Sequence, residues 1–167
     1  FLLIFLFYEN YLEIIFLQFI LLIFVIILFI DFKHFIIPDS LNFMFCLMAF
    51  LKNFTNNFDS NFTYNYITSI LGGALGFLII YAIIYFYKKF KNIEAMGLGD
   101  AKFMIGAGFL FGPESVLLIL FYGSVLGLIY VIPPLINKSK NLKTKLPFGP
   151  FLIFGTIIYY FSGNFLF

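Results

Sequence analysis

The sequence predicts an all-α protein, a polytopic transmembrane helical bundle of about six helices with the first one truncated. Hydrophobic residues make up 63% of the 167 residues, and charged residues make up only 11%. A single soluble domain of this size could not bury so much apolar surface. In addition, apolar runs of roughly bilayer length recur along the chain. We therefore expect a lipid bilayer to surround a single domain that comprises residues 1–167.

The expected helices follow these apolar runs in chain order. They lie at residues 11–30, 35–51, 66–87, 101–111, 115–135 and 148–161, after a partial segment at 1–7. The run at 101–111 is too short to cross a hydrocarbon core of about 30 Å at about 1.5 Å per residue. We expect it to be extended by Gly99-Asp100 and by Gly112-Pro113, or to lie in a thinned region of the bilayer. Because the chain begins inside an apolar segment at Phe1, we also expect further sequence before that residue.

The lysines predict the orientation of the bundle. If the connections after residues 30, 87 and 135 share one side, that side carries nine lysines and the other side carries only Lys52. The nine are Lys33, Lys88, Lys89, Lys91, Lys102, Lys138, Lys140, Lys143 and Lys145. An excess of lysine marks the cytoplasmic side of a membrane protein. The net charge of +2 is too small to indicate a nucleic-acid partner.

Three pairs of glycines spaced four residues apart predict close contacts between helices. They are Gly72 and Gly76, Gly108 and Gly112, and Gly123 and Gly127. Small residues at this spacing let two helix backbones approach closely where lipid provides no hydrophobic drive for association. Together the pairs indicate a compact bundle.

Two aspartates stand at the edges of apolar runs, Asp31 after the run at 11–30 and Asp100 before the run at 101–111. An ionised carboxylate beside hydrocarbon is costly, so a membrane protein that keeps such groups is expected to use them. If the bundle brings the two together they share a proton, because like charges a few ångströms apart do not both ionise cheaply. One carboxylate can then draw a proton from water while the protonated partner polarises a peptide carbonyl. Gly97 and Gly99 allow backbone conformations closed to other residues and leave room for an extended substrate strand.

Three segments resemble motifs of the bacterial type IV prepilin leader peptidases. Residues 30–39 (IDFKHFIIPD) are similar to the first motif, an aspartate followed by Pro-Asp at positions 38 and 39. Residues 96–102 (MGLGDAK) resemble the GxGD signature, which archaeal preflagellin peptidases and presenilins share. Residues 146–151 (LPFGPF) resemble a third segment near the last helix. The order and spacing of the three motifs across nearly the whole chain make the resemblance specific.

The resemblance implies a transmembrane aspartic endopeptidase domain that removes the leader peptide of prepilins or pseudopilins at the cytoplasmic face of the bacterial inner membrane. It implies Asp31 and Asp100 as the catalytic pair. The supporting motif positions are Pro38, Asp39, Gly97, Gly99, Lys102, Pro147, Gly149 and Pro150.

The resemblance also bears on cofactors. Proteolysis by two aspartates is expected to need no metal and no cofactor. S-adenosylmethionine would be used only if a methyltransferase activity were present. Many bacterial members carry that activity together with an N-terminal domain that has paired CxxC motifs, and no such motif occurs in this sequence. The sequence does not specify an oligomeric state.

Two other functions fit the same aspartates. A proton-coupled transporter component would use them as a proton relay, but a carrier favours acids near the bilayer midplane and broken helices in symmetry-related halves. A structural assembly subunit would use them only to cap helices, and Asp100 alone could be such a cap. Asp39 is equally well explained as the start of the next helix, and Lys102 as an anchor at the membrane surface.

Overall fold

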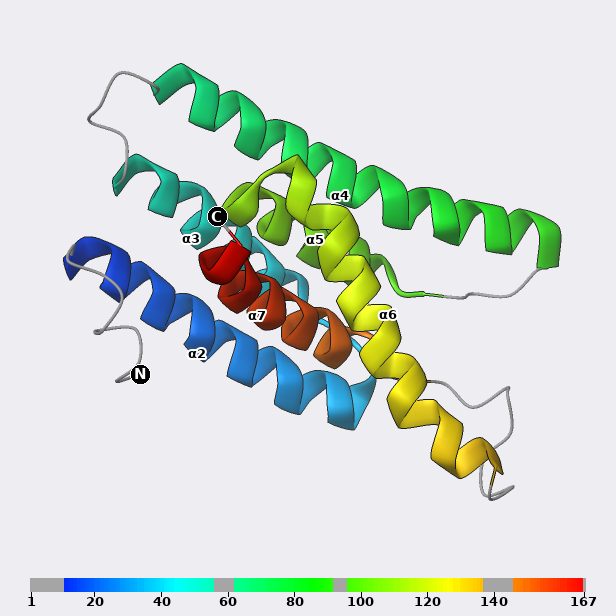
Figure 1. Ribbon diagram of the computed structural model, residues 1–167. Helices are drawn as coiled ribbons and strands as arrows, with labels where there is room; N and C mark the ends of the chain where they lie inside the picture. Colours follow the sequence, from blue (N-terminus) through cyan, green and yellow to red (C-terminus); the bar gives the residue numbers. More distant parts are fainter. Residues whose placement is uncertain (1–10, 56–61, 92–95, 137–145, 167) are drawn as a thin grey trace.

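The computed structural model describes residues 11–55, 62–91, 96–136 and 146–166, and this part of the chain is all-α, as predicted (Figure 1). Its six helices are α2 (Tyr11–His34), α3 (Asp39–Thr55), α4 (Phe62–Lys91), α5 (Leu98–Phe111), α6 (Pro113–Ile136) and α7 (Gly149–Leu166). Every predicted helix from residue 11 onward is found, with ends that differ by a few residues. The partial segment predicted at 1–7 lies outside the described residues.

Three of these helices are long and apolar enough to cross a membrane. They are the stretches Tyr11–His34, Tyr66–Phe90 and Pro113–Pro133, which form most of α2, α4 and α6. The apolar stretch Gly149–Ser162 in α7 is shorter, and α3 and α5 have 17 and 14 residues. The apolar side chains on the outer surfaces of the long helices, such as Phe29, Leu78 and Leu128, are more than half exposed, as expected where lipid is the solvent.

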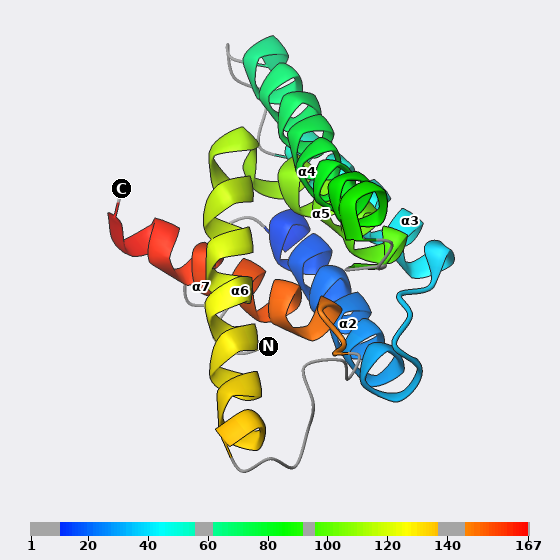
Figure 2. The same cartoon turned by 90° about the vertical axis from the view of Figure 1, so that its right-hand side faces the viewer.

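Successive helices run in opposite directions, so the helix ends gather at two opposite ends of the bundle. The C-terminal ends of α2, α4 and α6 and the N-terminal ends of α3, α5 and α7 lie together, on the right of Figure 1. We call this the aspartate end, because Asp31 lies in the last turn of α2 and Asp100 in the first turn of α5. Figure 2 looks at the bundle from this end.

The described lysines divide between the two ends as the sequence predicted. The lysines at the aspartate end are Lys33, Lys88, Lys89, Lys91 and Lys102. Lys52 lies near the C-terminal end of α3, at the opposite end of the bundle. The other four lysines of the prediction lie outside the described residues. The membrane face to which the aspartate end belongs stays a prediction.

Helix α5 occupies the centre of the bundle, and glycines let α4 pack closely against it. A Cβ atom on Gly108 of α5 would overlap the carbonyl oxygen of Gly72 in α4, and one on Gly76 would lie 2.5 Å from the Met104 carbonyl oxygen. On the other side of the bundle, a Cβ on Gly123 of α6 would lie 3.1 Å from the Phe151 carbonyl oxygen in α7. The predicted glycine contacts are therefore confirmed for α4 with α5 and for α6 with α7.

The expected extension of α5 is half right. The helix does extend N-terminally through Asp100, but it ends before Gly112-Pro113. Gly112 has a φ of 83°, which only glycine adopts easily, and its N–H donates to the Gly108 carbonyl at 2.8 Å. Pro113 then opens α6, where its missing N–H costs nothing. Gly112 is thus a corner residue and does not extend the helix.

Three phenylalanines join the helices that carry the aspartate end. Phe24 of α2, Phe45 of α3 and Phe103 of α5 are each at most 3% exposed, and their ring centroids lie 4.9 to 5.5 Å apart. The three pairs are edge-on, tilted and stacked, and ring contacts at these distances stabilise a core beyond the burial of area alone. This cluster fixes α2, α3 and α5 relative to one another one to two turns from the two aspartates.

Candidate active site

Asp31 is positioned by the sharp end of α2. The N–H of Phe35 donates to the Asp31 carbonyl at 2.9 Å, and Phe35 has a φ of 58°, the left-handed conformation that often ends a helix. Ile37 then turns inward and is 5% exposed, and Pro38 disfavours a helical conformation for the residue before it. Helix α3 begins at Asp39, as the alternative explanation of Asp39 predicted.

Asp100 is positioned by the first turn of α5. The Gly97 N–H donates to Asp100 Oδ2 at 3.2 Å, and the Asp100 N–H donates to the Gly97 carbonyl at 3.2 Å. Asp100 therefore does act within a helix cap, although its side chain is only 7% exposed. Its position is thus compatible with both the capping and the catalytic explanation of this residue.

The sequence predicted that Gly97 and Gly99 adopt backbone conformations closed to other residues, and this part of their expected role is wrong. Gly97 has φ −81° and ψ 149°, an extended conformation open to any residue. Gly99 is needed for space, because a Cβ there would lie 3.1 Å from Ile37 Cβ and 3.3 Å from the Ile37 carbonyl oxygen. The small residue lets the start of α5 lie directly against the turn that follows Asp31.

The two carboxyl groups lie close enough to interact. Burial, and then the negative charge of Asp31, raise the pKa of Asp100 from 3.8 to about 7, while the Gly97 N–H opposes the rise. Asp100 lies in α5, whereas the three helices long enough to cross a membrane are α2, α4 and α6. Asp31 is 3% exposed. Both carboxyl groups are therefore buried, and the charge of Asp31 acts on Asp100.

Gly149 of the third motif lies against Asp31 of the first motif. A Cβ on Gly149 would lie 2.6 Å from Asp31 Oδ2 and 2.9 Å from Ile37 Cδ1, so only glycine leaves room for the carboxylate. Gly149 opens α7, and the partial positive charge of a helix N-terminus therefore faces Asp31. Pro150 is buried in the first turn of α7, where proline is favoured, and Pro147 is half-buried just before the helix.

Two contacts tie α3 to the turn that carries Asp100. The Asn42 side chain donates to the Gly99 carbonyl at 3.1 Å, and Asn42 is 2% exposed. Lys102 Nζ lies 2.7 Å from Asp39 Oδ1. Two of the supporting motif residues, Lys102 and Asp39, are thus partners of each other at the surface of the site. The membrane-surface anchor expected for Lys102 stays a prediction, and the ion pair with Asp39 is compatible with it.

Asn42 did not emerge from the motifs. The available signal was its spacing, because Asn42, Phe45 and Ala49 fall on one face of a helix at intervals of three and four, and all three are buried. A polar residue on the inward face of an apolar helix needs a hydrogen-bond partner. The sequence could predict that need, but it could not identify the Gly99 carbonyl.

Comparison with known proteins gives a relative and a family for this chain. A relative named "Prepilin leader peptidase/N-methyltransferase", from Xanthomonas campestris pathovar campestris, is 31% identical over 78 residues, which are 47% of this chain. Those residues cover 27% of the relative, so the match spans about a quarter of that protein's length. No solved structure matches the chain. The model of the type IV leader peptidase family matches residues 16–132, a range that contains both Asp31 and Asp100. The chain therefore belongs to the type IV leader peptidase family.

Proposed function

We propose that this chain is an aspartic endopeptidase of the membrane that removes leader peptides from prepilins or pseudopilins, with Asp31 and Asp100 as its catalytic pair. The observation that carries the proposal is the burial of both carboxyl groups at one end of the bundle, where the charge of Asp31 acts on Asp100. Family membership supports the reaction class. The pairing of acids supports the mechanism, since two carboxyl groups that share one proton supply a base and an acid together.

In the proposed reaction Asp31 is the base and Asp100 is the acid. Oδ2 of Asp31 is buried and has no hydrogen-bond partner among the described residues, so it can accept a proton from water. Protonated Asp100 donates its proton to the oxygen of the scissile carbonyl as the water oxygen bonds to carbon. The proton on Asp31 then passes to the amide nitrogen, and the C–N bond breaks to give an acid and an amine. Return of a proton to Asp100 restores the pair.

The charge of Asp31 favours this assignment of roles. Burial disfavours ionisation of both carboxyl groups, and a helix N-terminus lies beside each of them. The negative charge of Asp31 in addition raises the pKa of Asp100, so Asp100 is the partner that holds the proton. The lysine-rich aspartate end suggests the cytoplasmic face of the bacterial inner membrane as the place of cleavage. A substrate cut there would be anchored in the same bilayer.

The rival explanations are less well supported. A proton relay would need acids along a path through the bilayer, whereas Asp31 and Asp100 both lie at helix ends on one side. Simple capping explains the bond from Gly97 to Asp100 but gives no reason to bury a second carboxyl group beside it. The proposal covers peptide hydrolysis and does not include methyl transfer.

Reconstitution in liposomes with a prepilin-like precursor tests the proposal. We expect the unmodified chain to cleave the precursor, and Asp31→Asn and Asp100→Asn each to lower kcat by about 1000-fold or more. Asp39→Asn is the matched control, since Asp39 carries an exposed carboxylate at the same end, and it should stay within about tenfold of the unmodified chain. Full cleavage by either dyad variant would refute the assignment. Proton leakage that depends on both aspartates, without cleavage, would identify a transporter.

A further inference from the structure

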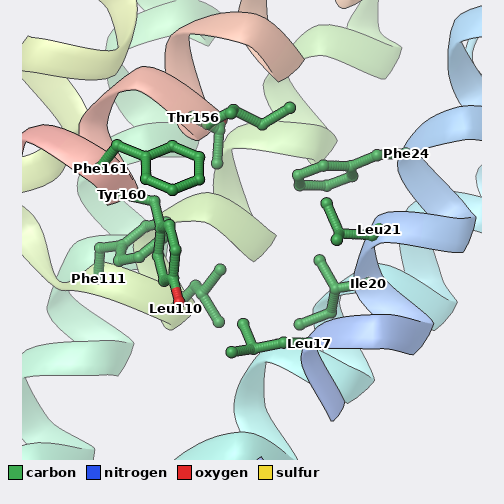
Figure 3. A pocket seen from close by; sticks show the side chains of 10 residues that line it. Leu17, Ile20, Leu21, Phe24, Leu110, Phe111, Thr156, Tyr160 and Phe161 are labelled. Atoms are coloured by element: carbon green, nitrogen blue, oxygen red, sulfur yellow. The ribbon is translucent and has the colours of Figure 1, made fainter. Parts of the chain in front are cut away.

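An apolar pocket lies along the same three helices that hold the two aspartates. It has a volume of about 150 Å³ and is partly open at the surface of the bundle. Figure 3 shows Leu17, Ile20, Leu21 and Phe24 of α2 on one wall and Thr156, Tyr160 and Phe161 of α7 on another, with Leu110 and Phe111 of α5 closing the space between them. The active-site mechanism does not use this pocket.

The position of the pocket relative to the aspartates follows from the helix rise. Phe24 precedes Asp31 by seven residues, which is about 10 Å along α2, and Leu110 follows Asp100 by ten, which is about 15 Å along α5. Phe161 follows Gly149 by twelve residues, which is about 18 Å along α7. The pocket therefore lies about 10 to 20 Å from the aspartates, away from the aspartate end and toward the bilayer interior.

The chemistry of the lining selects an apolar occupant. Almost all of the surface is hydrocarbon, and the hydroxyl of Thr156 is already engaged because it donates to the Leu152 carbonyl at 2.8 Å. The pocket thus offers burial and dispersion contacts. A cavity of this size lined by Leu, Ile and Phe side chains accommodates a benzene-sized group. One aromatic or branched aliphatic side chain has the right volume.

We infer that this pocket binds one bulky apolar side chain of the membrane-anchored precursor, in the segment that follows the scissile bond. The inference rests on the proposed function. A precursor cut at the aspartates must continue from them into the bilayer, and α2, α5 and α7 form both the cut site and the pocket. A helical segment covers 10 to 18 Å in about 7 to 12 residues, and an extended one in fewer. The pocket thus selects substrates by a side chain remote from the cleaved bond, and contacts of this kind can be used to align the bond with the catalytic groups.

Two enzyme variants and one control test the inference. Leu21→Trp fills the pocket from α2, at a half-buried position that tolerates a larger side chain, and Ile157→Phe fills it from α7. Leu22→Trp is the matched control, because Leu22 is 51% exposed on the outer face of the same helix. Each protein is assayed in liposomes against a set of precursors in which the first twenty residues after the scissile bond are replaced singly by alanine.

With the unmodified chain and with Leu22→Trp, we expect one or two alanine positions to lower kcat/KM by about tenfold. With Leu21→Trp or Ile157→Phe, the parent precursor should already show that loss, and the same alanine replacements should add nothing. A flat scan with the unmodified chain would overturn the inference. So would filled variants that lower kcat/KM by the same factor on the parent precursor and on the precursor with alanine at the sensitive position, and this result would point to a lipid acyl chain in the pocket. Absence of cleavage by the unmodified chain would instead refute the proposed function.

Discussion

Replacing Asp100 by asparagine should stabilise the folded bundle at neutral and alkaline pH. Burial and the charge of Asp31 raise the pKa of Asp100 from 3.8 to about 7, so the folded state binds a proton between these pH values that the unfolded state has lost. Stability therefore falls as the pH rises from about 4 to about 7. Each pKa unit corresponds to about 1.4 kcal/mol, which gives an upper limit of about 4 kcal/mol. Asparagine carries no charge and avoids this cost.

The assay is unfolding in detergent micelles at a series of pH values. We expect the asparagine variant and the unmodified chain to differ little below pH 4, and the variant to be more stable by up to about 4 kcal/mol at pH 8. Asp31→Asn should reduce the pH dependence only in part, because burial is the larger cause. Asp39→Asn, at an exposed carboxylate, should change stability by less than about 1 kcal/mol. Equal stability of the Asp100 variant and the unmodified chain at pH 8 would contradict a buried pair.

Four further substitutions, one of them a control, probe the shell around the aspartates and the helix packing. Gly149→Ala places a methyl group 2.6 Å from Asp31 Oδ2 and should lower kcat by about 100-fold in a chain whose circular dichroism is unchanged; normal turnover would argue against this contact. Gly108→Ala should lower the free energy of unfolding by about 2 to 4 kcal/mol, because its methyl group overlaps the backbone of α4. Gly127→Ala is the control, and it should lower the free energy of unfolding by less than about 1 kcal/mol, because the nearest neighbour of its methyl group lies 3.7 Å away. Similar values for both would contradict the close packing. Asn42→Leu leaves the carbonyl before Asp100 without its donor and should cost about 1 to 3 kcal/mol and lower kcat more than it changes KM; unchanged kcat would show that this bond does not position the site.

The sequence could predict the elements because bilayer insertion is governed by local composition. A helix in lipid must satisfy its own backbone hydrogen bonds, and it appears in the sequence as a long apolar run. The sequence contains such a run for each of α2, α4 and α6. The corner at Gly112 was predicted less well. A Gly-Pro pair can prolong one helix or separate two helices. Which of the two occurs here depends on where α6 packs against α7.

The roles of the motif residues show where local sequence reasoning stops. Spacing and the cost of charge near hydrocarbon pointed to Asp31 and Asp100, although they are 69 positions apart. Gly149 was recognised only as a motif position, and Gly99 was expected to serve backbone conformation and a substrate strand. Both of them approach Ile37, and Gly149 also approaches Asp31. No local pattern carries that information, because Asp31 and Ile37 belong to α2 and the turn after it, whereas Gly99 and Gly149 belong to α5 and α7.

The sequence by itself determined that this is an all-α membrane bundle, and it pointed to the two acids that we propose as the catalytic pair, because apolar length and charge beside hydrocarbon are properties of single segments. Only the tertiary structure decided that α7 begins beside Asp31, that Asn42 holds the turn before Asp100, and that α2, α5 and α7 line an apolar pocket away from the aspartates. These features depend on which helix faces pack together. That choice is made by the volumes and hydrogen bonds of residues far apart in the chain.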